Sequence, residues 1–425
     1  MKTENPVSAP PPASLWRHGD FLKLWGGQSV SLLGTYVTAF VLPLMGVLML
    51  DASAGQLGVL RALEYLPFAV LALPVGLWVD RVRQRRTMII TNFVRAAVLA
   101  AVPFIAWLGH LQMGHLYTLA LALGAGAVFF DLCYLSQLPT IVPQSQLLDG
   151  NSKLTASTSV AEVGGPALGG MLVQILTAPV VLLFDVISYL ISAVSLLKIR
   201  TPEPPPQRQP AEGKSLRHEL FAGVRLIFAD PYLRVVAADG MLFNILIQVI
   251  EILIIPYAIR DLHYSAGLLG VVLTAMAAGS IPGALCAQRL VSRFGYGRMV
   301  MAGVVLHSTG PLILATAAGG RLPTIILIAV GLAVMGFGIG LTNVLGVTLR
   351  QVRTPRHLLG RMNAGMRLML YGAIPLGALL AGLLGETLGN REGLLVAAVA
   401  LFLGLPIVWF SPVRKLAAVA DGAVE

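Results

Sequence analysis

We single out seven ionisable side chains that lie within the long apolar runs of this chain. They are Glu64, Arg95, Asp131, Glu162, Asp185, Asp239 and Glu251. A charged group in an apolar interior is costly unless it finds a partner or is neutralised by a proton. Each of these side chains is therefore a candidate for binding a proton, an ion or a polar ligand.

The acids differ in their neighbours along the sequence. Glu162 lies in the middle of its apolar run, and no basic residue stands near it. A buried carboxyl group without a basic partner favours its protonated form, which suits a proton carrier near neutral pH. Glu162 is our first candidate for proton coupling, with Asp131 and Asp185 as alternates. Arg95 lies at a similar expected depth to Asp131, so the two could form either a functional or a structural ion pair.

Apolar runs of about 20 residues, the length that crosses a bilayer as a helix, recur along the chain. The sequence is 56% hydrophobic and 12% charged, whereas soluble domains are about 25% charged. We predict an all-α membrane protein with twelve transmembrane helices. Their approximate ranges are 25–50, 56–79, 87–108, 116–136, 154–176, 180–197, 233–257, 267–290, 299–318, 323–346, 362–385 and 393–411.

Most lysines and arginines fall in every second loop, which places those loops and both termini in the cytoplasm. The same distribution argues against nucleic acid as a partner, although the formal net charge is +10. The segment Ser53-Ala-Gly-Gln-Leu-Gly-Val recurs as Ser265-Ala-Gly-Leu-Leu-Gly-Val, and the same offset along the chain carries Gly170 to Gly382. The repeat predicts two pseudo-symmetric six-helix bundles in parallel orientation, with a binding site between them.

The predicted organisation has five parts. They are a disordered cytoplasmic tail (1–20), a first bundle (21–198), a cytoplasmic linker with an amphipathic helix on the membrane surface (199–231), a second bundle (232–412) and a cytoplasmic tail (413–425).

The loop after the second predicted helix carries Gly76, Asp80, Arg81, Arg85 and Arg86. Retention of positive charge in the cytoplasm explains the arginines but neither the acid nor the glycine. The segment resembles the loop between the second and third helices of the major facilitator superfamily. The resemblance implies that the glycine lets a neighbouring helix approach. It also implies that the acid caps a helix and pairs across the two halves, as a conformational gate.

The fifth predicted helix contains Gly165-Pro166 and Gly169-Gly170, which are similar to a signature of antiporters in that superfamily. Phe129-Phe130-Asp131 and Asp185-Val-Ile-Ser-Tyr resemble its drug–proton antiporter branch, which includes macrolide-efflux proteins and the enterobactin exporter. One departure is that the fourth predicted helix has no arginine, a residue that many drug–proton antiporters use for proton coupling. In this chain that role must move elsewhere or be absent.

The resemblance also implies that the first, fourth, seventh and tenth helices line a cavity. Our substrate-binding candidates are Tyr36, Asn244, Gln248, Glu251 and Asn343. We predict a monomeric, multi-pass protein of the inner (cytoplasmic) membrane that exports an amphiphilic small molecule, such as a drug, a macrolide or a siderophore. A proton gradient drives it by alternating access, and no cofactor is expected.

Two alternatives remain. A lipid or lysolipid flippase shares this fold, and a lateral apolar opening would favour it. A membrane enzyme or a metal-binding receptor is disfavoured, because no His/Cys/Asp cluster has ligand spacing and no nucleophile motif occurs. The absence of a phosphate-binding loop argues against direct use of ATP.

The gate motif yields a test. Replacing Asp80 with Asn keeps the size and removes the charge, so the protein should insert normally and lose most of its export. Efflux by cells that express equal amounts of each protein measures this. Normal efflux by Asp80→Asn would contradict the proposed role.

Overall fold

The computed structural model describes residues 15–79, 81–143, 146–203, 216–316, 321–355 and 358–417, and this part of the chain is helical with short connections and no strand. The first six long helices are α1 (Gly19–Leu50), α2 (Ala54–Val79), α3 (Gln84–Trp107), α4 (Met113–Ile141), α5 (Leu147–Ile175) and α6 (Ala178–Leu197). The second group contains α8 (Pro231–Pro256), α9 (Ala266–Phe294), α10 (Tyr296–Ala315), α11 (Arg321–Arg353), α12 (Leu359–Thr387), α13 (Asn390–Leu401) and α14 (Gly404–Trp409). Between the groups lies α7 (Leu216–Ala229).

Ten helical stretches among the described residues are long and apolar enough to cross a membrane. These ten do not include α2 and α5, and α13 and α14 together count as one. Large apolar side chains such as Trp107, Leu285 and Phe410 are highly exposed. Exposed apolar surface of this extent indicates contact with lipid.

The sequence repeat marks two helix crossings that join the two groups. A Cβ atom at Gly58 of α2 would collide with the carbonyl oxygen of Ala378 in α12. A Cβ atom at Gly270 of α9 would collide in the same way with the carbonyl oxygen of Pro166 in α5. The repeat offset relates Gly58 to Gly270 and Pro166 to Ala378. The duplicated segments therefore form two equivalent backbone contacts, which the absence of side chains permits.

Polar contacts surround these crossings at one end of the molecule, which we call the closed end. The Ser53 hydroxyl donates to Oε1 of Glu386 at 2.7 Å, and Arg260 forms an ion pair with Asp51 at 2.7 Å. Both contacts connect the first helix group to the second. They lie where α1 ends and α2 begins.

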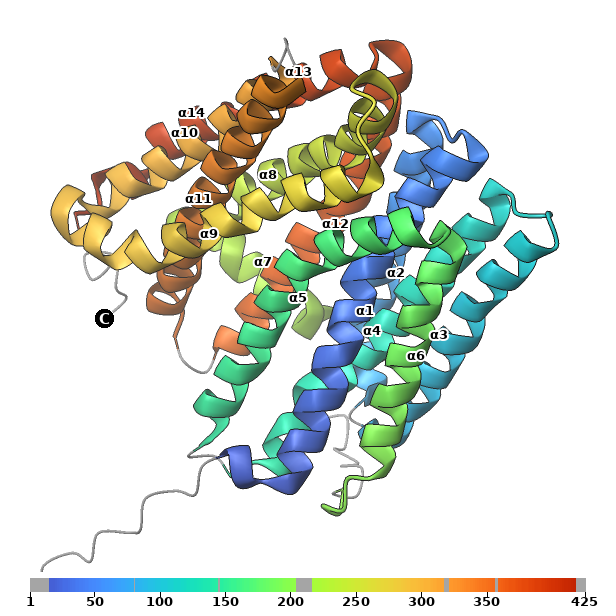
Figure 1. Cartoon of the computed structure of the whole chain (residues 1–425). Helices are drawn as coiled ribbons and strands as arrows, with labels where there is room; N and C mark the ends of the chain where they lie inside the picture. The colour runs from blue at the N-terminus through green and yellow to red at the C-terminus, as the bar shows by residue number, and fades with distance from the viewer. Residues whose placement is uncertain are drawn as a thin grey trace, which may run out of the picture.

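The opposite end, which we call the basic end, carries the loop from Arg81 to Arg86. Figure 1 shows α5 and α9 side by side near the closed end and diverging toward Leu147 and Phe294. The two groups therefore meet at the closed end and spread apart toward the basic end.

The start of the predicted linker is held in place. Asp20 accepts hydrogen bonds from the backbone N–H of Arg200 and from both the backbone N–H and the hydroxyl of Thr201. Arg85 donates its backbone N–H to Glu203 at 2.9 Å and its guanidinium to the carbonyl oxygens of Ile199 and Thr201. Residues 199–203 are thus fastened to α1 and α3. The linker residues 204–215 lie outside the described part.

The described parts of both predicted tails contact the helices. Leu15 is fully buried, and Trp16 makes an edge-on contact with Trp25 at 5.0 Å, so disorder does not extend over 15–20. At the other end, the backbone N–H of Gly297 donates to the carbonyl of Leu416 at 3.0 Å. The remaining tail residues, 1–14 and 418–425, lie outside the described part.

The predicted amphipathic helix is present as α7, but its described part packs on α12 instead of resting on a membrane surface alone. Gly223 of α7 crosses α12 so closely that a Cβ atom would collide with the carbonyl of Arg361. Ile227 is fully buried there with Met362 and Met366. Asp230 then caps α8 and forms an ion pair with Arg353 of α11 at 2.6 Å. These contacts attach α7 to the second group.

The crossings predict a conformational effect of adding one methyl group. Gly270→Ala should oppose joining of α5 and α9, since overpacking costs about 1–3 kcal/mol. A disulfide between cysteines placed at Ser53 and Glu386, across the other crossing, would report closure of this end. We expect its yield to fall about tenfold in Gly270→Ala. Gly26→Ala is the matched control, because its Cβ meets no atom within 4 Å. Equal yields in the two variants would contradict the prediction.

The held segment predicts that insertions near it differ by position. Four Gly/Ser residues inserted after Gln207 should leave efflux intact, since loop entropy grows slowly with length. The same insertion between Thr201 and Pro202 should reduce efflux, because it separates Thr201 from Glu203. Comparing efflux at equal expression tests both, and equal loss in both variants would show that the whole linker is structural.

Candidate functional site

Two adjoining cavities lie within the helix bundle. The larger, of about 290 Å³, is lined mainly by α1, α2 and α4, with Arg367, Tyr371 and Ile374 of α12 closing one side, and we call it the first-half cavity. The smaller, of about 230 Å³, lies among α1, α2, α5, α8 and α9, and we call it the interface cavity. They share Tyr36, Ala39, Leu42, Glu64 and Tyr65 in their walls, so the two cavities adjoin along these residues.

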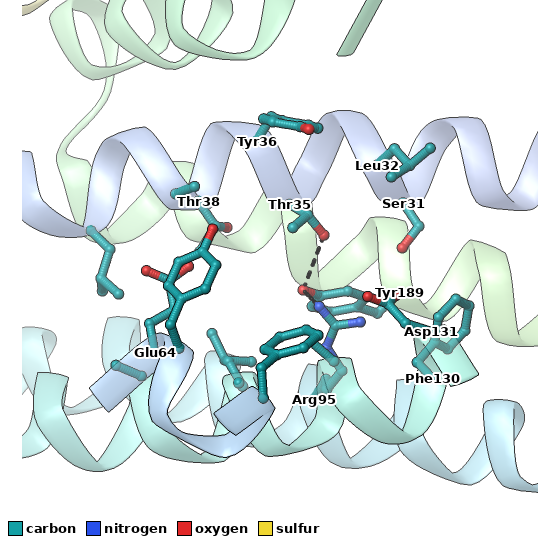
Figure 2. A pocket seen from close by; sticks show the side chains of 18 of the residues that line it. Ser31, Leu32, Thr35, Tyr36, Thr38, Glu64, Arg95, Phe130, Asp131 and Tyr189 are labelled. Atoms are coloured by element: carbon teal, nitrogen blue, oxygen red, sulfur yellow. Dashed lines mark hydrogen bonds between the residues drawn. The ribbon is translucent and has the colours of Figure 1, made fainter. Parts of the chain in front are cut away.

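Arg95 supplies the buried positive charge of the first-half cavity. Its guanidinium donates to the hydroxyl of Tyr189 at 2.6 Å and stacks over that ring at 4.2 Å. Tyr189 also shares a hydrogen bond with Thr35 at 3.3 Å, and Figure 2 shows these three side chains converging. Tyr189 lies on α6, one helical turn after Asp185. Its hydroxyl and ring therefore hold the Arg95 guanidinium in place.

The predicted ion pair between Arg95 and Asp131 is not formed. Asp131 instead lies 3.8 Å from the guanidinium of Arg367, which comes from α12 in the second group. Sequence analysis missed Arg367 because its partner lies in the other half of the chain. Its position inside an apolar run was the signal that could have identified it.

Asp185 is fully buried between α1 and α6. It accepts hydrogen bonds at 2.7 Å from the hydroxyls of Thr38 and Ser188. A Cβ atom at Gly34 would collide with both Asp185 and Ser188, so glycine makes room for this contact. The geometry is that of a well-satisfied carboxylate that joins two helices.

Arg61 connects the two helix groups beside the interface cavity. It forms ion pairs with Glu64 at 2.9 Å and with Glu251 of α8 at 3.3 Å. Its Nε donates to Gln248 at 3.1 Å, and its guanidinium lies 4.8 Å from the centre of the Tyr65 ring. The pair with Glu64 is local to α2, since the two residues stand three apart in the sequence. The extension to α8 was not predicted, since only the fold brings these helices together.

Glu162 lines the interface cavity and forms no hydrogen bond or ion pair with the described residues. One turn further along α5, a Cβ atom at Gly165 would collide with Tyr36. The glycine therefore lets the tyrosine backbone of α1 approach α5 beside the acid.

The other antiporter-signature glycines have separate contacts. Gly169 lies against Phe40 and Val41 of α1, whereas Gly170 faces the backbone of Ala266 in α9. Together with Gly165 and Pro166, they make α5 the helix that contacts both α1 and the second group. The signature is thus a packing surface in this structure.

The predicted substrate-binding residues separate into two sets. Tyr36 and Glu251 line the cavities, and Gln248 is buried beside them in contact with Arg61. Asn244 donates to the carbonyl of Gly240 in its own helix, and neither Asn244 nor Asn343 lines either cavity.

The predicted gate motif is only partly described. Gly76 faces open space, since a Cβ atom there meets nothing within 4 Å, so the expected helix approach does not occur in this conformation. Arg85 holds residues 199–203 as described above, and Asp80 lies outside the described residues. No cluster of three potential metal ligands occurs among the described residues, 15–417 with the gaps given above.

Comparison with curated proteins identifies several efflux proteins as relatives. The chain is 27% identical over 392 residues to the multidrug efflux pump Tap of Mycolicibacterium fortuitum, covering 90% of this chain and 93% of that one. It is 22% identical to macrolide efflux protein A of Streptococcus pyogenes, over 93% of this chain and 97% of that one. It is 24% identical to the enterobactin exporter EntS of Citrobacter koseri, over 96% of each chain.

The fold is also that of a solved transporter. A bacterial homologue of the iron transporter ferroportin, solved in an inward-facing state, superposes with a TM-score of 0.73 at 18% identity, over 93% of this chain and 99% of that one. At that identity the likeness shows the fold alone. The family model described as transmembrane secretion effector, MFS_3, matches residues 11–424. The chain therefore belongs to this family of major facilitator efflux transporters, which are multi-pass membrane proteins and not enzymes.

Proposed function

We propose that this chain is a proton-driven exporter of amphiphilic small molecules that works by alternating access in the cytoplasmic membrane. The single observation that carries this proposal is the pair of adjoining cavities lined by residues of both helix groups, with ionisable and aromatic residues in an otherwise apolar wall. A polar site enclosed by two pseudo-symmetric halves is the arrangement of secondary transporters.

In this proposal the chain crosses the membrane twelve times, and both termini lie in the cytoplasm. The protein acts as a monomer and uses no cofactor. The six helices of each group supply the spans, with α13 and α14 forming the last one. In this orientation the closed end faces away from the cytoplasm, and the structure corresponds to a state open toward the basic end. The excess of arginine and lysine at that end supports the orientation.

Alternating access requires the two helix groups to separate at the closed end and to come together at the basic end. The crossings at Gly58 and Gly270 are backbone packing contacts, and parting them would also separate Arg61 from Glu251. Gly76, which faces open space here, would then be free to receive a neighbouring helix. Asp80 and the loop arginines are the proposed gate for that second state.

Glu162 is the proposed proton carrier. It faces the cavity between the groups and has no partner among the described residues, whereas Asp185 is satisfied by two hydroxyls and Asp131 faces Arg367. Access of water to Glu162 would change as α5 moves relative to α9, and with it the preference for the proton. Asp131 and Asp185 remain the alternates, and Arg95 orients Tyr189 beside them.

The substrate class is tested first by an accumulation screen of drugs, macrolides and siderophores in cells with and without the protein. We expect lower accumulation of at least one amphiphile in cells that express it. Collapse of the proton gradient with a protonophore should remove the difference. If no compound in the screen shows a difference, the proposed export is wrong.

The proton role is tested in vesicles. Glu162→Gln cannot release a proton, so it should abolish proton-driven accumulation of substrate, while binding of a neutral amphiphile remains. A variant that still moves protons in step with substrate would shift the role to Asp131 or Asp185. Glu392→Gln, which removes a carboxylate outside both cavities, is the control.

A further inference from the structure

The interface cavity has an uneven charge. Glu64, Glu162 and Glu251 contribute three carboxylates to its wall, and Arg61 contributes one guanidinium. Arg61 pairs with Glu64 and Glu251, so its single positive charge is shared between two acids. Glu162 has no ionic partner among the described residues. The wall therefore lacks positive charge where Glu162 faces it.

Aromatic and aliphatic side chains make up the rest of this wall. Tyr36 and Tyr65 provide rings, whose faces attract cations. Leu57, Leu60, Ile252, Ile255 and Met276 are among its aliphatic members. A ligand that fits must combine an apolar body with a group that satisfies a carboxylate.

The neighbouring first-half cavity differs in charge. Its positive groups are Arg95 and Arg367, and these stand against Asp131 and Glu64. Nε of Arg95 and Oε1 of Gln28 are buried there without a partner among the described residues, and Arg95 and Gln28 are 7% and 8% exposed. Unsatisfied buried polar atoms are rare, and they mark a site that a ligand or water completes. Arg95 and Arg367 repel a cation from the first-half cavity. The charged group of a cationic ligand is therefore directed toward Glu162 in the interface cavity.

We infer that the interface cavity binds a cationic amphiphile, with the charged nitrogen or onium centre beside Glu162 and the apolar body on the aliphatic wall. This inference rests on the proposed function and narrows its substrate class. An anion placed there would face three carboxylates in an apolar setting, where repulsion is weakly screened. A cation supplies the ionic partner that Glu162 lacks among the described residues, in a wall that is otherwise mostly apolar. Among the amphiphiles considered above, the site thus selects amines over anionic siderophores.

Three probes of similar shape separate charge from hydrophobicity. Tetraphenylphosphonium is a permanent cation, tetraphenylborate is the corresponding anion, and triphenylphosphine oxide is neutral. Binding to the purified full-length protein in lipid nanodiscs is measured against empty nanodiscs. We expect the cation to bind at least about tenfold more tightly than the anion, which corresponds to one charge-assisted contact.

Variants of Glu162 assign the contact. Glu162→Gln should weaken binding of the cation about tenfold and leave binding of triphenylphosphine oxide unchanged, which also shows that the variant is folded. Glu162→Asp retains the charge and should bind the cation nearly as the unmodified protein does. Glu392→Gln, outside both cavities, should have no effect. Equal affinity for the cation and the anion, or no effect of Glu162→Gln on cation binding, would overturn the inference.

The same probes distinguish this inference from the proposed function. If amphiphiles without positive charge are exported by a proton-dependent process while the cation is not preferred, the exporter stands and the cation site is wrong. If protein-containing vesicles accumulate no amphiphile of any charge, the proposed export is itself wrong. Cation binding that depends on Glu162 without export would retain the site and reject the transport.

Discussion

The two halves of this transporter meet where pairs of helix backbones approach too closely to admit a side chain. In water such contacts would be supported by burial of apolar surface. In lipid, packing must supply the attraction directly, and small residues allow the closest packing. Gly58 and Gly270 provide these contacts at equivalent positions of the two halves. Everything that lies between the halves, including the cavity, takes its shape from these crossings.

The ionic contacts across the cavity have a different physical character. Charged groups at membrane depth carry a cost of several kcal/mol each. Arg61 and Arg367 lower it by pairing with acids of the opposite half, at Glu251 and Asp131. The pairs thus make the stability of each charge depend on the relative position of the halves. A change in that position would have to replace these partners with water, ligand or other side chains.

Each half also fastens its own terminal segment to the hairpin at the basic end. In the first half, Glu203 receives the backbone N–H of Arg85 at the start of α3. In the second half, the carbonyl of Leu416 receives the backbone N–H of Gly297 at the start of α10. Arg85 and Gly297 occupy equivalent positions of the sequence repeat. Equivalent backbone N–H groups therefore donate to different acceptors. The acceptor is the carboxylate of Glu203 in the first half and the backbone carbonyl of Leu416 in the second half.

The sequence by itself determined the class of the protein, the long helices and the duplication of the halves. These follow from local properties: hydropathy over about 20 residues, the positions of arginine and lysine, and a constant spacing between related segments. It also identified Glu162 and Glu64, because an acid in an apolar run is unusual wherever the run lies, whereas Tyr36 was selected through the family resemblance. The antiporter signature was visible for the same reason, as a local cluster of glycines.

Only the tertiary structure decided which charges are partners. The similar depths of Arg95 and Asp131 suggested that these two pair with each other. In the structure Arg95 donates to Tyr189, and Asp131 lies beside Arg367. Depth along a helix can be counted from the sequence, but the direction of a side chain around the helix relative to other helices cannot. That direction depends on the rotation of each helix, which the glycine crossings and the packing of many distant residues set together. For this reason Glu251 proved to be a partner of Arg61, and only Glu162 among the interface-cavity acids was left without a positive neighbour in the described part of the chain.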